Sequence, residues 1–233
     1  MSERRPLSVE SSVERAEPGT LQRVVRDLRV GRETAGTREL VSRVARGLAG
    51  RVYRRERYLV IEQRIDELIE ARVPEGVRVS AFADEWDAVA PLLTSAVRRQ
   101  FELRARSGRA CLLAWRGDRV IGYTWMSTRI DPSIEGLPLA LPDSAAYLWD
   151  LFVIRRERSA GIGTALTGAR LAWTREAGFD LGWRAISPSN RPSARTAEKT
   201  GAVRVLGEIQ ALTRFGNSTY REQPFENRPL LTV

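Results

Sequence analysis

Histidine is absent from the 233 residues of this sequence, and cysteine occurs once, as Cys111. Without histidine, neither Ser-His-Asp nor Cys-His catalysis can operate, and the usual imidazole ligands of catalytic zinc are missing. A single cysteine excludes disulfides within the chain and cysteine-rich zinc sites, which fits a reducing compartment. We therefore expect a cytoplasmic protein without a metal, whose chemistry rests on carboxylates, hydroxyls, backbone donors or a reactive cofactor.

Lysine is almost absent as well. Lys199 is the only one among 38 basic residues, so the net charge of +9 is carried by guanidinium groups. A GC-rich genome is the first explanation, and attraction of anionic partners such as nucleic acid or a lipid surface is the second, less favoured one. No apolar run approaches the roughly 18 residues of a membrane span, and the polar N-terminus does not resemble a signal peptide. We expect no transmembrane segment.

The distribution of polar and apolar residues divides the chain into four parts. Before the main domain, apolar positions such as Leu21, Val24 and Leu28 recur at helical spacing between arginines. These basic helices are expected to pack on their own domain, with binding to lipid or nucleic acid as the alternative. A strand at 58–62 is expected as an added edge. The expected parts are a disordered tail (1–20), a helical basic N-terminal extension (21–76), an α/β domain (77–216) and a C-terminal tail (217–233).

The most informative stretch is residues 153–163, where an apolar strand runs into a basic, glycine-containing turn. The residues that follow carry apolar side chains at the spacing of a packed helix. Such a turn leaves several backbone N–H groups unpaired, and the helix dipole attracts a phosphate to them. A dinucleotide fingerprint is excluded because its third glycine position is Leu166, and no Gly-Lys-Ser/Thr supports a triphosphate loop.

A second segment, 190–202, begins with an asparagine suited to precede a helix and ends in Glu-Lys-Thr-Gly-Ala. Gly201 lies where the end of a helix favours a left-handed residue. The two segments resemble the two signatures of the GNAT superfamily of acetyl-CoA-dependent N-acetyltransferases. The residues that carry the resemblance are Arg158, Gly161 and Gly163 in the first segment, and Asn190, Ser193, Glu198, Lys199 and Gly201 in the second.

The resemblance covers roughly residues 77–216. It implies an α/β (α+β) class GNAT acyl-CoA N-acyltransferase fold, in which a mixed, mostly antiparallel sheet with splayed central strands is flanked by helices. The helical N-terminal extension would be added to this fold. It also implies acetyl-CoA as acyl donor, attacked directly by an amine in a ternary complex. The cofactor-binding residues implied in this way are Phe152, Val153, Ile154, Arg158, Ser159, Ala160, Gly161, Ile162, Gly163, Thr164, Asn190 and Ser193.

The catalytic groups are less clearly indicated. Asp150, inside an apolar strand, is the candidate base, because a carboxylate among apolar residues has a raised pKa; a structural hydrogen-bond partner or a contact to a cationic substrate is the alternative. Many family members have a tyrosine acid one residue before Glu-Lys, where this chain has Ala197. A thiol with a pKa of about 8.5 is a tolerable leaving group, so an acid is helpful rather than obligatory. The role of that tyrosine could be taken by solvent or by one of the side chains of Tyr147, Tyr220, Ser193 and Thr196.

Three functions remain open from the sequence. The first is acetylation of a small-molecule or protein amine. The second is acetylation of an RNA-borne amine such as aminoacyl-tRNA, suggested by the arginine-rich extension. The third, suggested by Ala197, is a non-catalytic acyl-CoA-binding module. The sequence identifies neither the acceptor nor the oligomeric state, for which a homodimer is one option.

Overall fold

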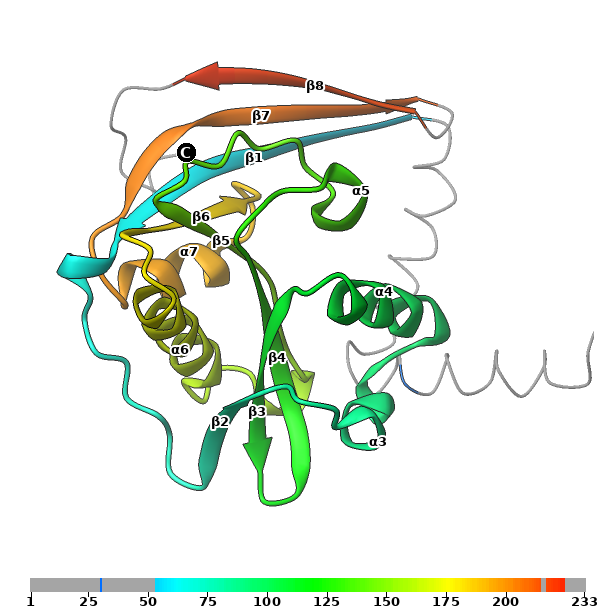
Figure 1. Cartoon of the computed structure of the whole chain (residues 1–233), viewed down its shortest axis with the longest axis vertical. Coiled ribbons are helices and arrows are strands. Elements are labelled where there is room, and N and C mark those ends of the chain that lie inside the picture. Colours follow the sequence, from blue (N-terminus) through cyan, green and yellow to red (C-terminus); the bar gives the residue numbers. More distant parts are fainter. Residues whose placement is uncertain (1–29, 31–52, 215–216, 225–233) are drawn as a thin grey trace, which may run out of the picture.

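The computed structural model describes residue 30, residues 53–214 and residues 217–224 (Figure 1). The tail expected at 1–20 and the helices expected between 21 and 52 therefore lie outside the described residues. The strands are β1 (Tyr53–Arg64), β2 (Val77–Ala81), β3 (Ala110–Arg116), β4 (Arg119–Ser127), β5 (Ala145–Val153), β6 (Leu181–Ile186), β7 (Arg204–Arg214) and β8 (Asn217–Pro224). The α-helices are α3 (Trp86–Val89), α4 (Ser95–Arg106), α5 (Pro132–Glu135), α6 (Ile162–Glu176) and α7 (Arg191–Glu198), with 3₁₀ turns η1 (Ile65–Glu67), η2 (Ala90–Leu92) and η3 (Arg155–Glu157).

All eight strands form one sheet in the order β2-β3-β4-β5-β6-β1-β7-β8. Every neighbouring pair is antiparallel except β5 and β6, which are parallel. The pairing of β5 with β6 ends at Tyr147 and Trp183, although β5 continues to Val153 and β6 to Ile186. The two central strands therefore separate, as expected for the mixed, mostly antiparallel sheet of this fold.

Strand β1 corrects the prediction of an added edge. It lies inside the sheet, antiparallel to β6 on one side and to β7 on the other. Its centre, from Leu59 to Ile61, is buried. Beside this buried centre, Arg57 pairs with Glu208 across to β7. The sheet also continues past the expected C-terminal boundary, because 217–224 form β8.

Helices cover both faces of the sheet (Figure 1). On one face, α6 packs through Ile162, Leu166 and Leu171 against apolar residues of β4 and β5, and α7 buries Ala194 and Ala197 against β1 and β6. On the other, Val89 of α3 and Phe101 of α4 join an aromatic cluster from β3 to β5. No helix in the described ranges is both long and apolar enough to span a membrane.

Candidate functional site

The glycine-containing turn between β5 and α6 has a backbone that suits its sequence. After η3, Ser159 and Gly161 have positive φ angles of 65° and 81°, and α6 begins at Ile162. Glycine adopts this conformation without strain, so Gly161 can turn the chain sharply into the helix. At Gly163 a Cβ would lie 3.5 Å from Thr196 Cγ2 and 3.9 Å from Leu151 Cδ2, so this position faces both β5 and α7.

The turn presents a row of backbone donors. None of the N–H groups from Ser159 to Thr164 donates to a backbone carbonyl among the described residues, because each lies in the turn or the first turn of α6. Ser159, Ala160 and Gly161 are exposed. Unpaired N–H groups at the positive end of a helix dipole form an anion-binding site. The turn therefore has the geometry expected for holding a phosphate group.

Side chains around the turn hold it in place. Arg158, expected to bind the cofactor, donates from Nε to the carbonyl of Val153 at 3.0 Å, which ties the turn to the end of β5. Glu157 pairs with Arg116 of β3. The segment before β2 also touches the turn: a Cβ at Gly161 would lie 3.3 Å from Pro74 Cγ. These contacts preorganise the donors without covering the exposed residues at the centre.

The second signature forms the start of α7. Asn190 is the N-cap, and its side-chain oxygen accepts a hydrogen bond from the N–H of Ser193 at 3.3 Å. Gly201, after the helix, has a φ of 147°, and a Cβ there would lie 3.0 Å from the carbonyl oxygen of Glu67. Glycine is thus required both by conformation and by close packing. Ala197 is fully buried on the sheet side of α7, so its position belongs to the core.

The environment of Asp150 differs from the expected one. Asp150 has a positive φ of 43° and lies at an irregularity in the pairing of β4 with β5. This irregularity makes its side chain exposed rather than enclosed among apolar neighbours. The carboxylate forms an ion pair with Arg104 of α4. The Arg104 guanidinium lies 4.3 Å from the ring centre of Trp149 and 5.7 Å from that of Trp125.

The candidate acids are spread out. Tyr147 is buried and stacks on Trp149, and burial, followed by the nearby Glu135, raises the pKa of its phenol above the usual value. Tyr220, on β8, donates its hydroxyl to the carbonyl of Gly136 at 3.2 Å. Thr196 donates to the carbonyl of Ser193 at 2.8 Å. Of these candidate acids, Thr196 lies against Gly163, at the start of α6.

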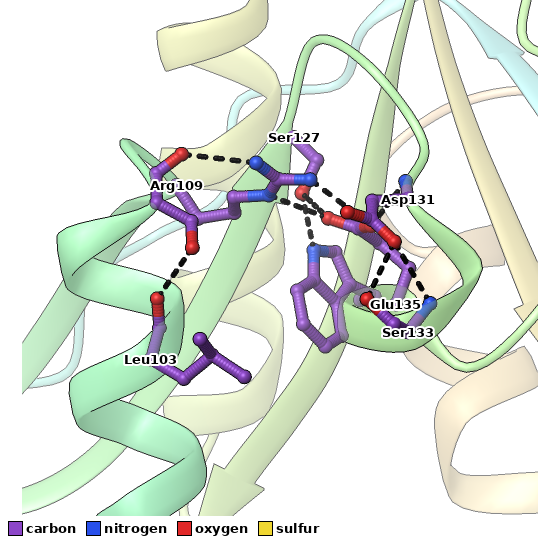
Figure 2. Close-up of polar contacts among 8 residues, drawn as sticks. Leu103, Arg109, Ser127, Asp131, Ser133 and Glu135 are labelled. Carbon is purple, nitrogen blue, oxygen red and sulfur yellow. Dashed lines mark hydrogen bonds and ion pairs between the residues drawn. The ribbon is translucent and has the colours of Figure 1, made fainter.

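A buried polar network that sequence spacing did not reveal supports this region (Figure 2). Arg109 donates from Nε to Glu135 at 2.8 Å and from Nη2 at 3.3 Å, with both side chains almost fully buried. Ser127 donates to the same carboxylate at 2.7 Å and accepts from Trp149 Nε1 at 2.9 Å. The network thereby fixes Trp149 next to Asp150. Because the partners are up to 26 residues apart, only the folded chain brings them together.

The single cysteine and the possibility of a metal site remain to be described. Cys111 is buried, as expected, and burial raises the pKa of its thiol. Among the described residues, no group of three or more Cys, Asp and Glu side chains is arranged to hold a metal ion.

Comparison with known proteins gives a match to one protein family. The model of the acetyltransferase (GNAT) family matches residues 78–202, which is more than half of the chain. No curated protein is similar enough in sequence to match. Among solved structures, a Drosophila protein is 14% identical with a TM-score of 0.50, over 76% of this chain and 58% of that chain.

Two other solved structures are of N-acetyltransferases. A GCN5-related N-acetyltransferase from Sphaerobacter thermophilus is 16% identical, with a TM-score of 0.49, over 84% of this chain and 60% of that one. A glucosamine N-acetyltransferase region of a fungal multi-domain β-N-acetylglucosaminidase is 14% identical, with a TM-score of 0.48, over 72% of this chain and 22% of that chain. This chain thus spans less than two thirds of each of these three structures.

Proposed function

This chain belongs to the acetyltransferase (GNAT) family, and on that premise we propose that it transfers an acetyl group from acetyl-CoA to an amine by direct attack in a ternary complex. The observation that carries the proposal is the row of N–H groups at Ser159–Thr164 that have no backbone partner among the described residues, with Ser159, Ala160 and Gly161 exposed, placed where β5 and β6 have separated. These donors would hold the diphosphate of CoA.

The pantetheine arm would run along the unpaired part of β5. Of the three residues expected there, Ile154 already donates its N–H to the carbonyl of Ile121 at 2.9 Å. The N–H groups of successive residues point to opposite sides of a strand. Since the N–H of Ile154 points to β4, the N–H of Val153 faces away from β4, toward the separated β6. We therefore assign the contact to Val153, with Phe152 packing beside it. Asn190 and Ser193, at the start of α7, would border the arm on the other side.

Asp150 would receive the amine. Its carboxylate and the ring faces of Trp149 and Trp125 already bind a cation, the guanidinium of Arg104. A carboxylate beside aromatic faces favours a protonated amine over a neutral acceptor. Asp150, directly or through water, would take the proton that the amine must lose before it attacks the thioester carbonyl. The attack forms a tetrahedral oxyanion, which collapses to an amide and the thiolate of CoA.

No protein acid is required for the last step. The raised pKa of Tyr147 makes its phenol a poor proton donor to a thiolate whose own pKa is about 8.5. Ala197 cannot supply a proton, and it is fully buried. We propose that solvent protonates the thiolate, as it can in an exposed site. The buried free thiol of Cys111 is compatible with a cytoplasmic location.

The first test is binding and turnover with acetyl-CoA. Ligand at about 100 times its dissociation constant should add about 2.7 kcal/mol of stability, measured as a rise in the thermal unfolding midpoint. Incubation with acetyl-CoA and a panel of amines should then release CoA thiol, detected with Ellman's reagent. Cys111 is 4% exposed and should add little background. Stabilisation without thiol release from any amine would favour the non-catalytic acyl-CoA-binding module, and no stabilisation would contradict the proposal.

A further inference from the structure

Two arginines are buried on the α6 side of the sheet. Arg170 of α6 and Arg184 of β6 are each 2% exposed. Arg184 lies two residues from Gly182, where a Cβ would meet Leu148 Cδ1 at 2.8 Å and Leu171 Cδ2 at 3.0 Å. Since residues two apart share a face of a strand, Arg184 also points into the layer between the sheet and α6.

Neither guanidinium has a carboxylate partner in the part of the chain that the structure describes. Arg170 donates from Nη1 to the hydroxyl of Thr124 at 3.1 Å, and Arg184 donates from Nη2 to the side-chain oxygen of Gln63. Both acceptors are neutral. Within residues 53–214 and 217–224, three guanidinium donors have no hydrogen-bond partner: Nε of Arg170, and Nε and Nη1 of Arg184. The buried hydroxyl of Thr167, one turn before Arg170 on α6, also has none.

The two charges act on each other. Burial lowers the pKa of Arg170 to about 9, so this side chain is still a cation at neutral pH. Burial, and then repulsion by Arg170, lowers the pKa of Arg184 well below its usual value. Buried cations are stable only when an opposite charge and hydrogen-bond acceptors accompany them. One anion shared by both side chains would supply the charge and accept the unused donors.

The position of the pair connects it to the separated strands. Arg184 directly follows Trp183, the last residue of β6 that pairs with β5. Arg170 lies on α6, the helix whose first turn carries the unpaired N–H groups. Arg184 therefore lies where β5 and β6 stop pairing, and Arg170 lies on the helix that covers this face of the sheet. The far end of an acyl group that entered between the separated strands would approach the pair from there. Guanidinium groups bind carboxylates through paired N–H donors, which gives this anion its chemical class.

We propose that Arg170 and Arg184 together bind a carboxylate between α6 and the sheet. The carboxylate has two sources, the distal group of a dicarboxylic acyl-CoA or a small free carboxylate. The first source rests on the function proposed above, and the second does not.

Calorimetric titration of the full chain with succinyl-CoA and with acetyl-CoA tests the first source. Wild-type protein should bind succinyl-CoA at least about tenfold more tightly, the difference expected for a charged hydrogen-bonded contact. The preference should disappear in Arg170→Met and in Arg184→Met, while acetyl-CoA still binds. Arg175→Met, which removes an exposed charge from the same helix, is the matched control and should keep the preference.

Thermal unfolding in sodium formate and in sodium pivalate at equal concentration tests the second source. Formate, which is small enough to enter, should raise the unfolding midpoint of the wild type, and the bulkier pivalate should not. The shift should be lost in both methionine variants. If formate acts this way but no acyl-CoA binds, the carboxylate site is supported and the proposed function fails.

The wild-type comparisons need no variant, so poor folding of a methionine variant does not block the test. Equal affinity for the two acyl-CoA thioesters, together with equal effects of formate and pivalate, overturns the proposal. It is also overturned if either preference persists in both methionine variants.

Discussion

Replacing Ala160 by aspartate is expected to weaken acetyl-CoA binding at least about tenfold without loss of folding. Ala160 is exposed at the centre of the turn, between Ser159 and Gly161. Two unit charges about 4 Å apart interact by about 1 kcal/mol in water and by about 4 kcal/mol near a protein surface. A carboxylate here would occupy the positive end of α6 and repel the diphosphate. The same charge near a helix N-terminus stabilises the helix by about 0.3–1 kcal/mol.

Ala160→Asn is the matched control, because it adds a side chain of nearly the same size without the charge. Calorimetric titration should give the asparagine variant an affinity within a few-fold of the wild type. Thermal unfolding without ligand should show that the aspartate variant is at least as stable. Equal affinity of the aspartate and asparagine variants would show that no diphosphate lies near residue 160.

Replacing Arg109 by methionine is expected to cost about 3–5 kcal/mol of folding stability, because it leaves the carboxylate of Glu135 buried without its counter-charge. The side chain of Glu135 is 0% exposed, so water cannot replace the lost partner. The remaining contacts of the carboxylate, from Ser127 and from the N–H of Asp131, do not neutralise it. Denaturant unfolding of the single variant against the wild type measures the loss.

The double variant Arg109→Met with Glu135→Gln separates charge from packing. It removes both charges, and the amide at position 135 can accept from the N–H of Asp131 and donate to the hydroxyl of Ser127, so it should recover a large part of the lost stability. If the free energy of unfolding of the single variant falls by less than about 1 kcal/mol, the ion pair of Arg109 and Glu135 does not stabilise this network substantially. If the double variant is no more stable than the single one, the loss comes from packing rather than from the unpaired charge.

The turn before α6 and the start of α7 could be predicted because their structure is local. Gly161 and Gly163 determine a sharp entry into a helix, and Asn190 caps α7 through a residue only three positions away. The order of strands within 77–216 followed from alternation and turn residues in the same way. Local signals of this kind are sufficient to place the turn between β5 and α6.

Features set by contacts between distant segments could not be predicted. The position of β1 inside the sheet depends on pairing with β6 and β7, more than 100 residues away, whereas the sequence predicted an added edge. The environment of Asp150 depends on a local irregularity and on Arg104, 46 residues earlier. Arg170 and Arg184 are arginines in amphipathic segments, where sequence alone predicts exposure.

Amide hydrogen exchange at residues 159–164 tests the central claim most directly. In the free protein these N–H groups have no backbone partner, so they should exchange rapidly. Saturating acetyl-CoA should slow their exchange strongly, because the diphosphate oxygens accept hydrogen bonds from them, while those amides of β7 and β8 that exchange by local opening should not change. If acetyl-CoA stabilises the protein but leaves exchange at 159–164 unchanged, the diphosphate is bound elsewhere and the account is wrong.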